Sequence, residues 1–164
     1  MRNPRFFLNS MLGVVIAAAA CSNEQVAPSF DLAKAVKPPK VAVCDPLKPV
    51  TTSALFGPAG GTLKVGPHRL VIPAGALADT VTISGSISGA AVDAIQFAPE
   101  GLHFNVGATL TMGTESCKTL DQPTTVIVYT DDALNILETI AVSASTSKTV
   151  SGTLWHFSQY AVAY

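Results

Sequence analysis

The chain has few charged residues, few cysteines and a single tryptophan among its 164 residues. Lys, Arg, Asp and Glu make up only 13% of the sequence, and no basic run is present, which argues against a surface for nucleic acid or another polyanion. No segment has sustained helical periodicity, and no glycine-rich phosphate loop leads from a strand into a helix. We therefore expect no nucleic-acid partner, no cofactor and no enzymatic activity.

The first twenty residues have the three parts of a secretory signal. Arg2 and Arg5 give a positively charged start, residues 11–20 form an apolar core, and three alanines form a small-residue exit. The apolar run is too short to cross the ~30 Å hydrocarbon layer of a bilayer at 1.5 Å per residue. The sequence therefore predicts a signal peptide over 1–20.

The signal leads directly into a cysteine. Ala18-Ala19-Ala20-Cys21 resembles the lipobox of bacterial lipoproteins, although Ala18 stands where Leu is usual. The resemblance implies that Cys21 becomes an acylated N-terminus carrying palmitate and related chains, an anchor that scarcely dissociates from a membrane. The next residue is Ser22, whereas lipoproteins that stay at the inner membrane typically carry Asp at this position. By this resemblance we expect a lipid anchor in the bacterial envelope, at the outer membrane. The alternative is an ordinary signal cleaved near Cys21 without a lipid.

Residues 21–54 are interpreted as the lipidated cysteine followed by a flexible tether. The stretch 22–49 is rich in proline and has Phe30 as its one aromatic residue, so it buries too little apolar surface to offset its ordering entropy. Flexible-coil scaling gives it a reach of roughly 30 Å. Such a tether would hold a folded domain away from the membrane.

The two remaining cysteines are Cys44 and Cys117. An exported compartment permits disulfides, and an even number invites pairing. A bond between them would join the end of the tether to the domain and stabilise the fold by roughly 4 kcal/mol on the entropic model. Two free thiols are the alternative. We expect no metal site at these cysteines because no histidine lies near them in the sequence.

Residues 55–164 read as an all-β domain, an antiparallel β-sandwich. Short apolar runs alternate there with turns rich in Gly, Pro, Asn and Asp. The expected strands cover 62–65, 68–72, 81–87, 94–97, 108–112, 124–130, 137–142 and 150–160.

Two polar features within this domain are interpreted as structural. Asp131, Asp132 and Asn135 lack the regular spacing and the acidic count of a calcium loop, so we expect a solvated hairpin tip. A polar stripe of serines falls on one face of an expected strand and forms no catalytic array: Ser84, Ser86 and Ser88.

Four motifs in order resemble the ZU-five domain of zonula occludens proteins, netrin receptors and ankyrins, which also occurs in bacterial surface proteins. They are Gly60-Gly61-Thr62-Leu63, the run 70–77 with its Pro-Ala-Gly turn, the Pro-x-Gly turn within 98–104, and the closing segment 156–162. Together they cover most of residues 57–164. The resemblance implies a β-sandwich that binds protein partners and needs no cofactor.

The triplet His156-Phe157-Ser158 has a reactive precedent in that resemblance. In some death-domain signalling proteins with this domain, the chain cuts itself before the serine of the same sequence. The hydroxyl would attack the Phe157 carbonyl while His156 takes the proton. We expect packing instead, because only six residues follow Ser158 and because the triplet lies within the expected strand 150–160, where alternate residues would share one face.

Three histidines, His68, His103 and His156, could in principle meet in space as zinc ligands. Their spacing does not indicate a site, so we expect no metal. The sequence as a whole predicts a non-enzymatic envelope lipoprotein that displays a β-sandwich protein-interaction module on a tether. The alternatives are a module that hydrolyses its own Phe157–Ser158 bond and a structural accessory of an envelope assembly.

Overall fold

The computed structural model describes residues 37–117 and 125–164, and within this part it contains eleven β-strands and no helix. Residues 37–164 form one compact unit. The predicted signal peptide and Cys21 lie outside the described residues.

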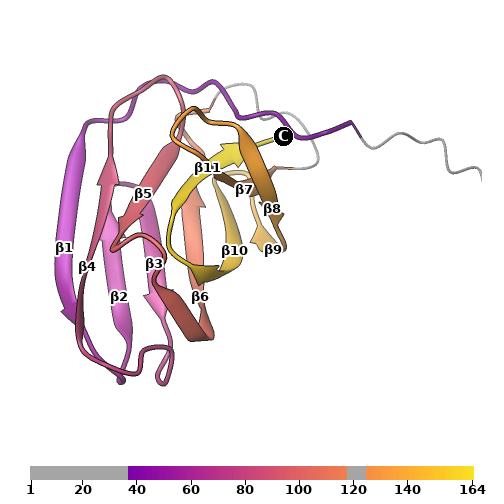
Figure 1. Cartoon of the computed structure of the whole chain (residues 1–164). Helices are drawn as coiled ribbons and strands as arrows, with labels where there is room; N and C mark the ends of the chain where they lie inside the picture. The colour runs from indigo at the N-terminus through magenta and orange to yellow at the C-terminus, as the bar shows by residue number, and fades with distance from the viewer. Residues whose placement is uncertain (1–36, 118–124) are drawn as a thin grey trace, which may run out of the picture. The chain divides into compact units, whose positions relative to one another are not determined.

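The strands form two antiparallel sheets (Figure 1). The six-stranded sheet has the order β1 (Val50–Phe56), β4 (Val81–Ile87), β5 (Ala94–Ala98), β11 (Gln159–Ala163), β7 (Val126–Thr130) and β8 (Ile136–Ile140). The five-stranded sheet has the order β2 (Gly61–Val65), β3 (His68–Ile72), β6 (His103–Gly113), β10 (Thr149–His156) and β9 (Val142–Ser145). The predicted all-β antiparallel sandwich is confirmed.

The core lies between the two sheets. Alternate residues of each strand point inward, because successive side chains in a strand face opposite sides. The largest fully buried side chains include Tyr160, Phe97, Phe157, Leu110 and Leu154. Full burial of one such apolar side chain contributes about 1.5–3 kcal/mol, so this interior is the main source of stability.

The folded unit begins earlier than the predicted boundary at residue 55. Strand β1 starts at Val50, and Lys40 and Ala42 already form main-chain hydrogen bonds with Tyr164 and Val162 beside β11. The outward face of β1 is rich in hydroxyl side chains, as expected of an edge strand. Its sequence therefore gives little apolar signal, and most of the strand was predicted to be part of the tether. Residues 37–54, predicted to be flexible, belong to the sandwich.

Two predicted strands are each divided between the sheets. The expected strand 150–160 is broken: β10 ends at His156 and β11 begins at Gln159 in the other sheet. The expected strand 137–142 is divided at Ala141 into β8 and β9. A period of two identifies extended chain but does not locate the point where it crosses from one sheet to the other.

Most other predicted strands are confirmed within a few residues. The β6 strand is longer than expected, since it spans His103–Gly113 and not only 108–112. The β7 strand begins at Val126 in the described part, and Thr124 of the prediction lies outside it. The predicted polar hairpin around Asp131 joins the antiparallel pair β7 and β8, as expected.

Candidate functional site

The triplet His156-Phe157-Ser158 forms the bend that carries the chain from β10 in one sheet to β11 in the other. The main chain of residues 97–102 holds it: Phe157 N donates to Leu102 O at 2.8 Å, and Gly101 N donates to Phe157 O at 3.0 Å. The prediction that the triplet continues a strand is therefore wrong. The alternation that would place His156 and Ser158 on one face does not exist.

The side chains of Ser158 and His156 line different cavities. Ser158 lines a cavity with Gln96 and Gln159, whereas His156 lines another with Trp155 and Glu138. Within the described residues no hydrogen bond joins the histidine to the serine hydroxyl. In this conformation His156 is not placed to take the proton of Ser158.

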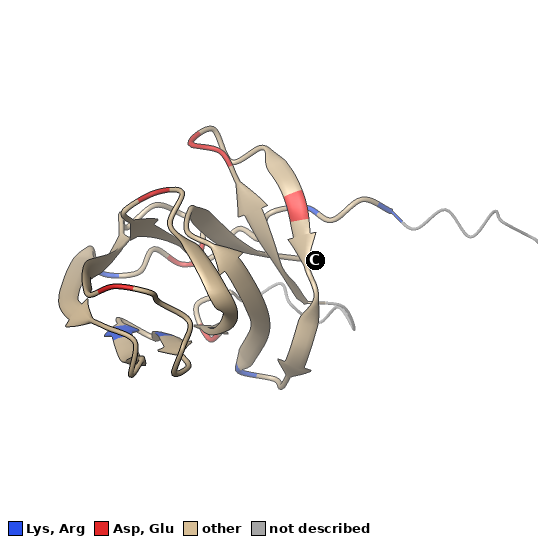
Figure 2. Cartoon of the chain, turned by 60° about the horizontal axis from the view of Figure 1, so that its bottom comes forward, with Lys and Arg blue, Asp and Glu red and all other residues tan. Residues whose placement is uncertain are grey.

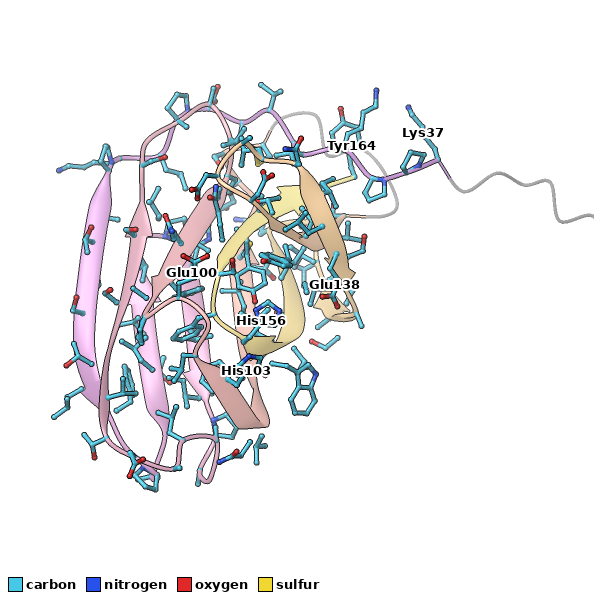
Figure 3. The ribbon with its side chains drawn as sticks, in the orientation of Figure 1. Lys37, Glu100, His103, Glu138, His156 and Tyr164 are labelled. Carbon is cyan, nitrogen blue, oxygen red and sulfur yellow. A yellow bond between two sulfur atoms is a disulfide. The ribbon has the colours of Figure 1, made fainter. Side chains whose placement is uncertain are left out.

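The imidazole of His156 belongs instead to a cluster of rings. The rings of Tyr129 and His103 lie 5.1 and 5.9 Å from it between centroids, and Figure 3 shows the two histidines next to each other. Tyr160 Oη donates to the carbonyl of His156 at 2.6 Å. Burial first, and then the charges of Glu138 and Tyr129, raise the pKa of Tyr160 well above its usual value. The phenol therefore stays protonated and remains a donor.

Trp155 is the most exposed aromatic side chain of the described domain, with 58% of its surface accessible. It lies beside a cavity of about 190 Å³ that is lined by Ile140, Ala141, Thr153, His156 and Glu138 among others. That volume is below the ~300–1,000 Å³ typical of small-molecule pockets and suits a single side chain of a partner.

Strand irregularity positions the indole of Trp155. The register of β10 on β6 shifts between Leu154 and His156, so Trp155 lies at a bulge, a feature that re-aims side chains in sheets. A Cβ on Gly107 would lie 3.4 Å from Trp155 Cε2 and Cζ2 and would also meet the Thr153 methyl group. The glycine on β6 therefore leaves space for the Thr153 methyl group, with which such a Cβ would clash, whereas the indole would lie at an ordinary contact distance.

The structure joins Cys44 and Cys117 in a disulfide. Around it lie buried polar groups: Asp93 Oδ1 is 3.0 Å from His68 Nε2, and Asp93 Oδ2 accepts a hydrogen bond from Ser116 Oγ at 3.1 Å. We call these five residues the latch. The latch connects the segment before β1, the loop before β5, strand β3 and the loop after β6, so it ties the two sheets together.

The latch contains the one group of described residues whose spacing suits a metal ion. Ligand atoms of Cys44, Asp93 and Cys117 all lie within 4.8 Å of one another. The two sulfurs are bonded to each other, however, and a disulfide sulfur is not the thiolate that zinc requires. His68 lies in the latch, whereas His103 and His156 lie together elsewhere, so the three histidines do not form a common site.

A third feature, which sequence reasoning missed, lies on the outer face of the six-stranded sheet. Thr51, Ser86, Gln96, Gln159 and Thr130 are paired neighbours across five strands, from β1 to β7. We call them the polar row. The signal in the sequence was the serine stripe on β4, but the register that continues it across the sheet depends on long-range pairing.

Charged positions are few and mostly scattered over the described ribbon in Figure 2, and two basic residues, Lys64 and Arg69, are paired neighbours on β2 and β3. An exposed ion pair joins Lys148 Nζ and Glu115 Oε1 at 2.8 Å. Within the described residues no helix has the length and apolar character needed to cross a membrane.

Comparison of the chain with protein-family models and with curated proteins finds no match in either case.

Proposed function

We propose that the chain is a non-enzymatic bacterial envelope lipoprotein that displays a β-sandwich protein-interaction module on a tether. The signal-like residues 1–20, the lipobox-like sequence before Cys21 and the proline-rich stretch support the anchor and the tether. The resemblance to the ZU-five domain also supports a protein partner, and the β-sandwich agrees with the fold that this resemblance implies.

The observation that carries the proposal is Trp155. Tryptophan is enriched among the residues that dominate protein–protein binding energies, especially beside a pocket that a partner can fill. Here the indole is more than half exposed, and it lies at a bulge beside a cavity of side-chain size. A large apolar ring fixed in this way at the surface suits recognition.

The experiment is a pull-down from intact cells that express the tagged full-length chain. We expect Trp155→Ala to abolish recovery of a specific partner. Leu55→Ala is the matched control, because Leu55 is comparably exposed at 68% but lies on β1 of the other sheet. A partner recovered equally by both variants, or lost equally from both, would contradict the assignment of the surface.

The lipid anchor is tested separately. Growth with a palmitate analogue should label the wild-type chain and leave Cys21→Ser unlabelled, because the acyl chains require the thiol. Absence of label on the wild type would refute lipidation. The structural-accessory alternative predicts co-purification with one fixed envelope partner that does not depend on Trp155.

Self-cleavage remains the second candidate because the Phe157–Ser158 bond lies in a bend. The Phe157 carbonyl accepts a hydrogen bond from Gly101 N, which would stabilise negative charge on that oxygen. Attack by Ser158 Oγ on this carbonyl would break the amide bond and form an ester with a free Ser158 amine, and water would then release the Phe157 carboxylate. The intact mass of the purified chain decides: loss of residues 158–164 that Ser158→Ala prevents would support cleavage, and an intact wild-type chain would exclude it.

A further inference from the structure

We propose that the groove over the polar row binds a neutral oligosaccharide. This inference goes beyond the protein partner proposed for the Trp155 surface and does not rest on it. The polar row lies on the outer face of the six-stranded sheet, whereas Trp155 lies on a strand of the five-stranded sheet.

The row forms a continuous line of hydrogen-bonding groups. Strand pairing aligns Thr51 with Ser86, Ser86 with Gln96, Gln96 with Gln159, and Gln159 with Thr130. Neighbouring strands lie about 4.8 Å apart, so the five residues extend over roughly 19 Å. A line of regularly spaced polar groups suits an extended ligand with repeated hydroxyls.

The side chains of the row are not used by the fold. Within the described residues, the amides of Gln96 and Gln159 form no side-chain hydrogen bond, although each offers two donors and an acceptor. Thr130 is 1% exposed, and its hydroxyl is buried without a hydrogen-bond partner in the described part of the chain. Such an orphan costs about 1–3 kcal/mol, so its retention in the groove points to a partner from outside the chain.

The groove has the dimensions of a ligand site. Its main part has a volume of about 470 Å³, within the ~300–1,000 Å³ typical of small-molecule pockets. A smaller cavity of about 130 Å³, which reaches Thr130 and Tyr129, shares the lining residues Gln96, Asp132 and Gln159 with it. The two cavities are therefore parts of one groove.

The charge of the lining excludes anionic ligands. Asp132 and Glu100 contribute carboxylates, and no Lys or Arg lines either cavity. The third carboxylate, Asp131, is engaged within its own loop, where the side chain and backbone of Asn135 donate to it and hold its pKa below the usual range. Among the described residues these acids do not converge into a group that could hold a metal ion.

The same lining favours a saccharide over a peptide. Protein recognition relies on aromatic and arginine anchors in apolar pockets, but the main part of the groove offers only Ile87 and Ala94 as apolar side chains. Amides, hydroxyls and carboxylates both donate to and accept from sugar hydroxyls.

The test uses the full chain in detergent on an array of neutral hexasaccharides (gluco-, chito-, malto- and manno- series), followed by calorimetry with the best binder. We expect at least one to bind, and Gln96→Ala and Gln159→Ala each to lower the affinity about tenfold, which corresponds to 1.4 kcal/mol. Ser84→Ala is the matched control, because Ser84 lies on the same strand as Ser86 and lines neither cavity.

Three outcomes would overturn the proposal. They are no binding to any hexasaccharide, binding that both glutamine variants retain in full, and equal or tighter binding of an extended peptide or of an anionic hexasaccharide at the same residues. Trp155→Ala should leave saccharide binding unchanged, so failure here is distinguishable from failure of the protein-partner proposal. Circular dichroism of each variant shows whether the sandwich is intact.

Discussion

The latch and the polar row both hold polar side chains in the sandwich, but they differ in where those side chains find partners. In the latch, the carboxylate of Asp93 lies 3.0 Å from His68 Nε2 and accepts a hydrogen bond from Ser116, although His68 Nδ1 is buried without a hydrogen-bond partner in the described part of the chain. In the polar row, Thr130 and the two glutamines have no side-chain partner within the described residues. Polar groups satisfied internally stabilise a fold, whereas polar groups left open are suited to binding.

This difference makes opposite predictions for stability. Removing a latch group should destabilise the sandwich, because it leaves buried partners unsatisfied or releases the chain. Removing a group of the row should leave stability unchanged or increase it. Three experiments test this contrast.

The largest effect is expected from the disulfide. Replacing Cys44 and Cys117 together by Ala opens a link between residues 73 apart in sequence, and the entropic model predicts a loss of about 4 kcal/mol. Urea unfolding should show the loss as a lower midpoint. Wild type treated with reductant should match the double variant, and an unchanged midpoint in both would show that the link does not stabilise the fold.

The next effect is expected at Asp93. Asp93→Asn keeps the shape of the side chain but replaces a carboxylate oxygen that faces His68 and Ser116 in the buried latch, which should cost about 2 kcal/mol. Ser116→Ala, which removes only one hydrogen bond to the same carboxylate, should cost about 1 kcal/mol. If thermal unfolding ranks the two in the reverse order, the His68–Asp93 pair is not the centre of the latch.

The smallest effect has the opposite sign. Thr130→Val removes a buried hydroxyl that has no partner in the described part of the chain, so we expect the sandwich to gain about 1 kcal/mol. Thr111→Val is the matched control, because Thr111 on β6 shares a hydrogen bond of 2.8 Å with Ser151 and should lose stability. Equal changes in the two variants, measured by urea unfolding, would remove the distinction between satisfied and open hydroxyls.

Local patterns predicted the sandwich well, because short apolar runs and Gly or Pro turns report directly on strands. They predicted less well where one stretch of chain serves both sheets. The bend at Phe157–Ser158 and the crossing at Ala141 contain no Gly or Pro that would mark a turn. Strand β1 was missed for a different reason. An edge strand with Thr and Ser on its outer face has little apolar signal, although its pairing with β4 is complete.

The candidate sites were predictable only in part. The cysteine pairing was one of two alternatives that the sequence left open, because spacing does not give distance. The partner of His68 was not foreseen, since Asp93 comes from another strand connection. The polar row depends on register between strands as distant in sequence as β1 and β11, and register follows from the whole set of pairings rather than from any one segment.

The pairing of Lys40 and Ala42 with the end of β11 has a mechanical consequence. Tension applied to the chain before Lys37 first loads these few main-chain hydrogen bonds and then reaches Cys44. There the covalent bond to Cys117 passes the force across to the loop after β6, so β1 is not pulled out of its sheet. A short, breakable contact in series with a covalent stop lets the chain lengthen by a few residues under load while the domain stays folded.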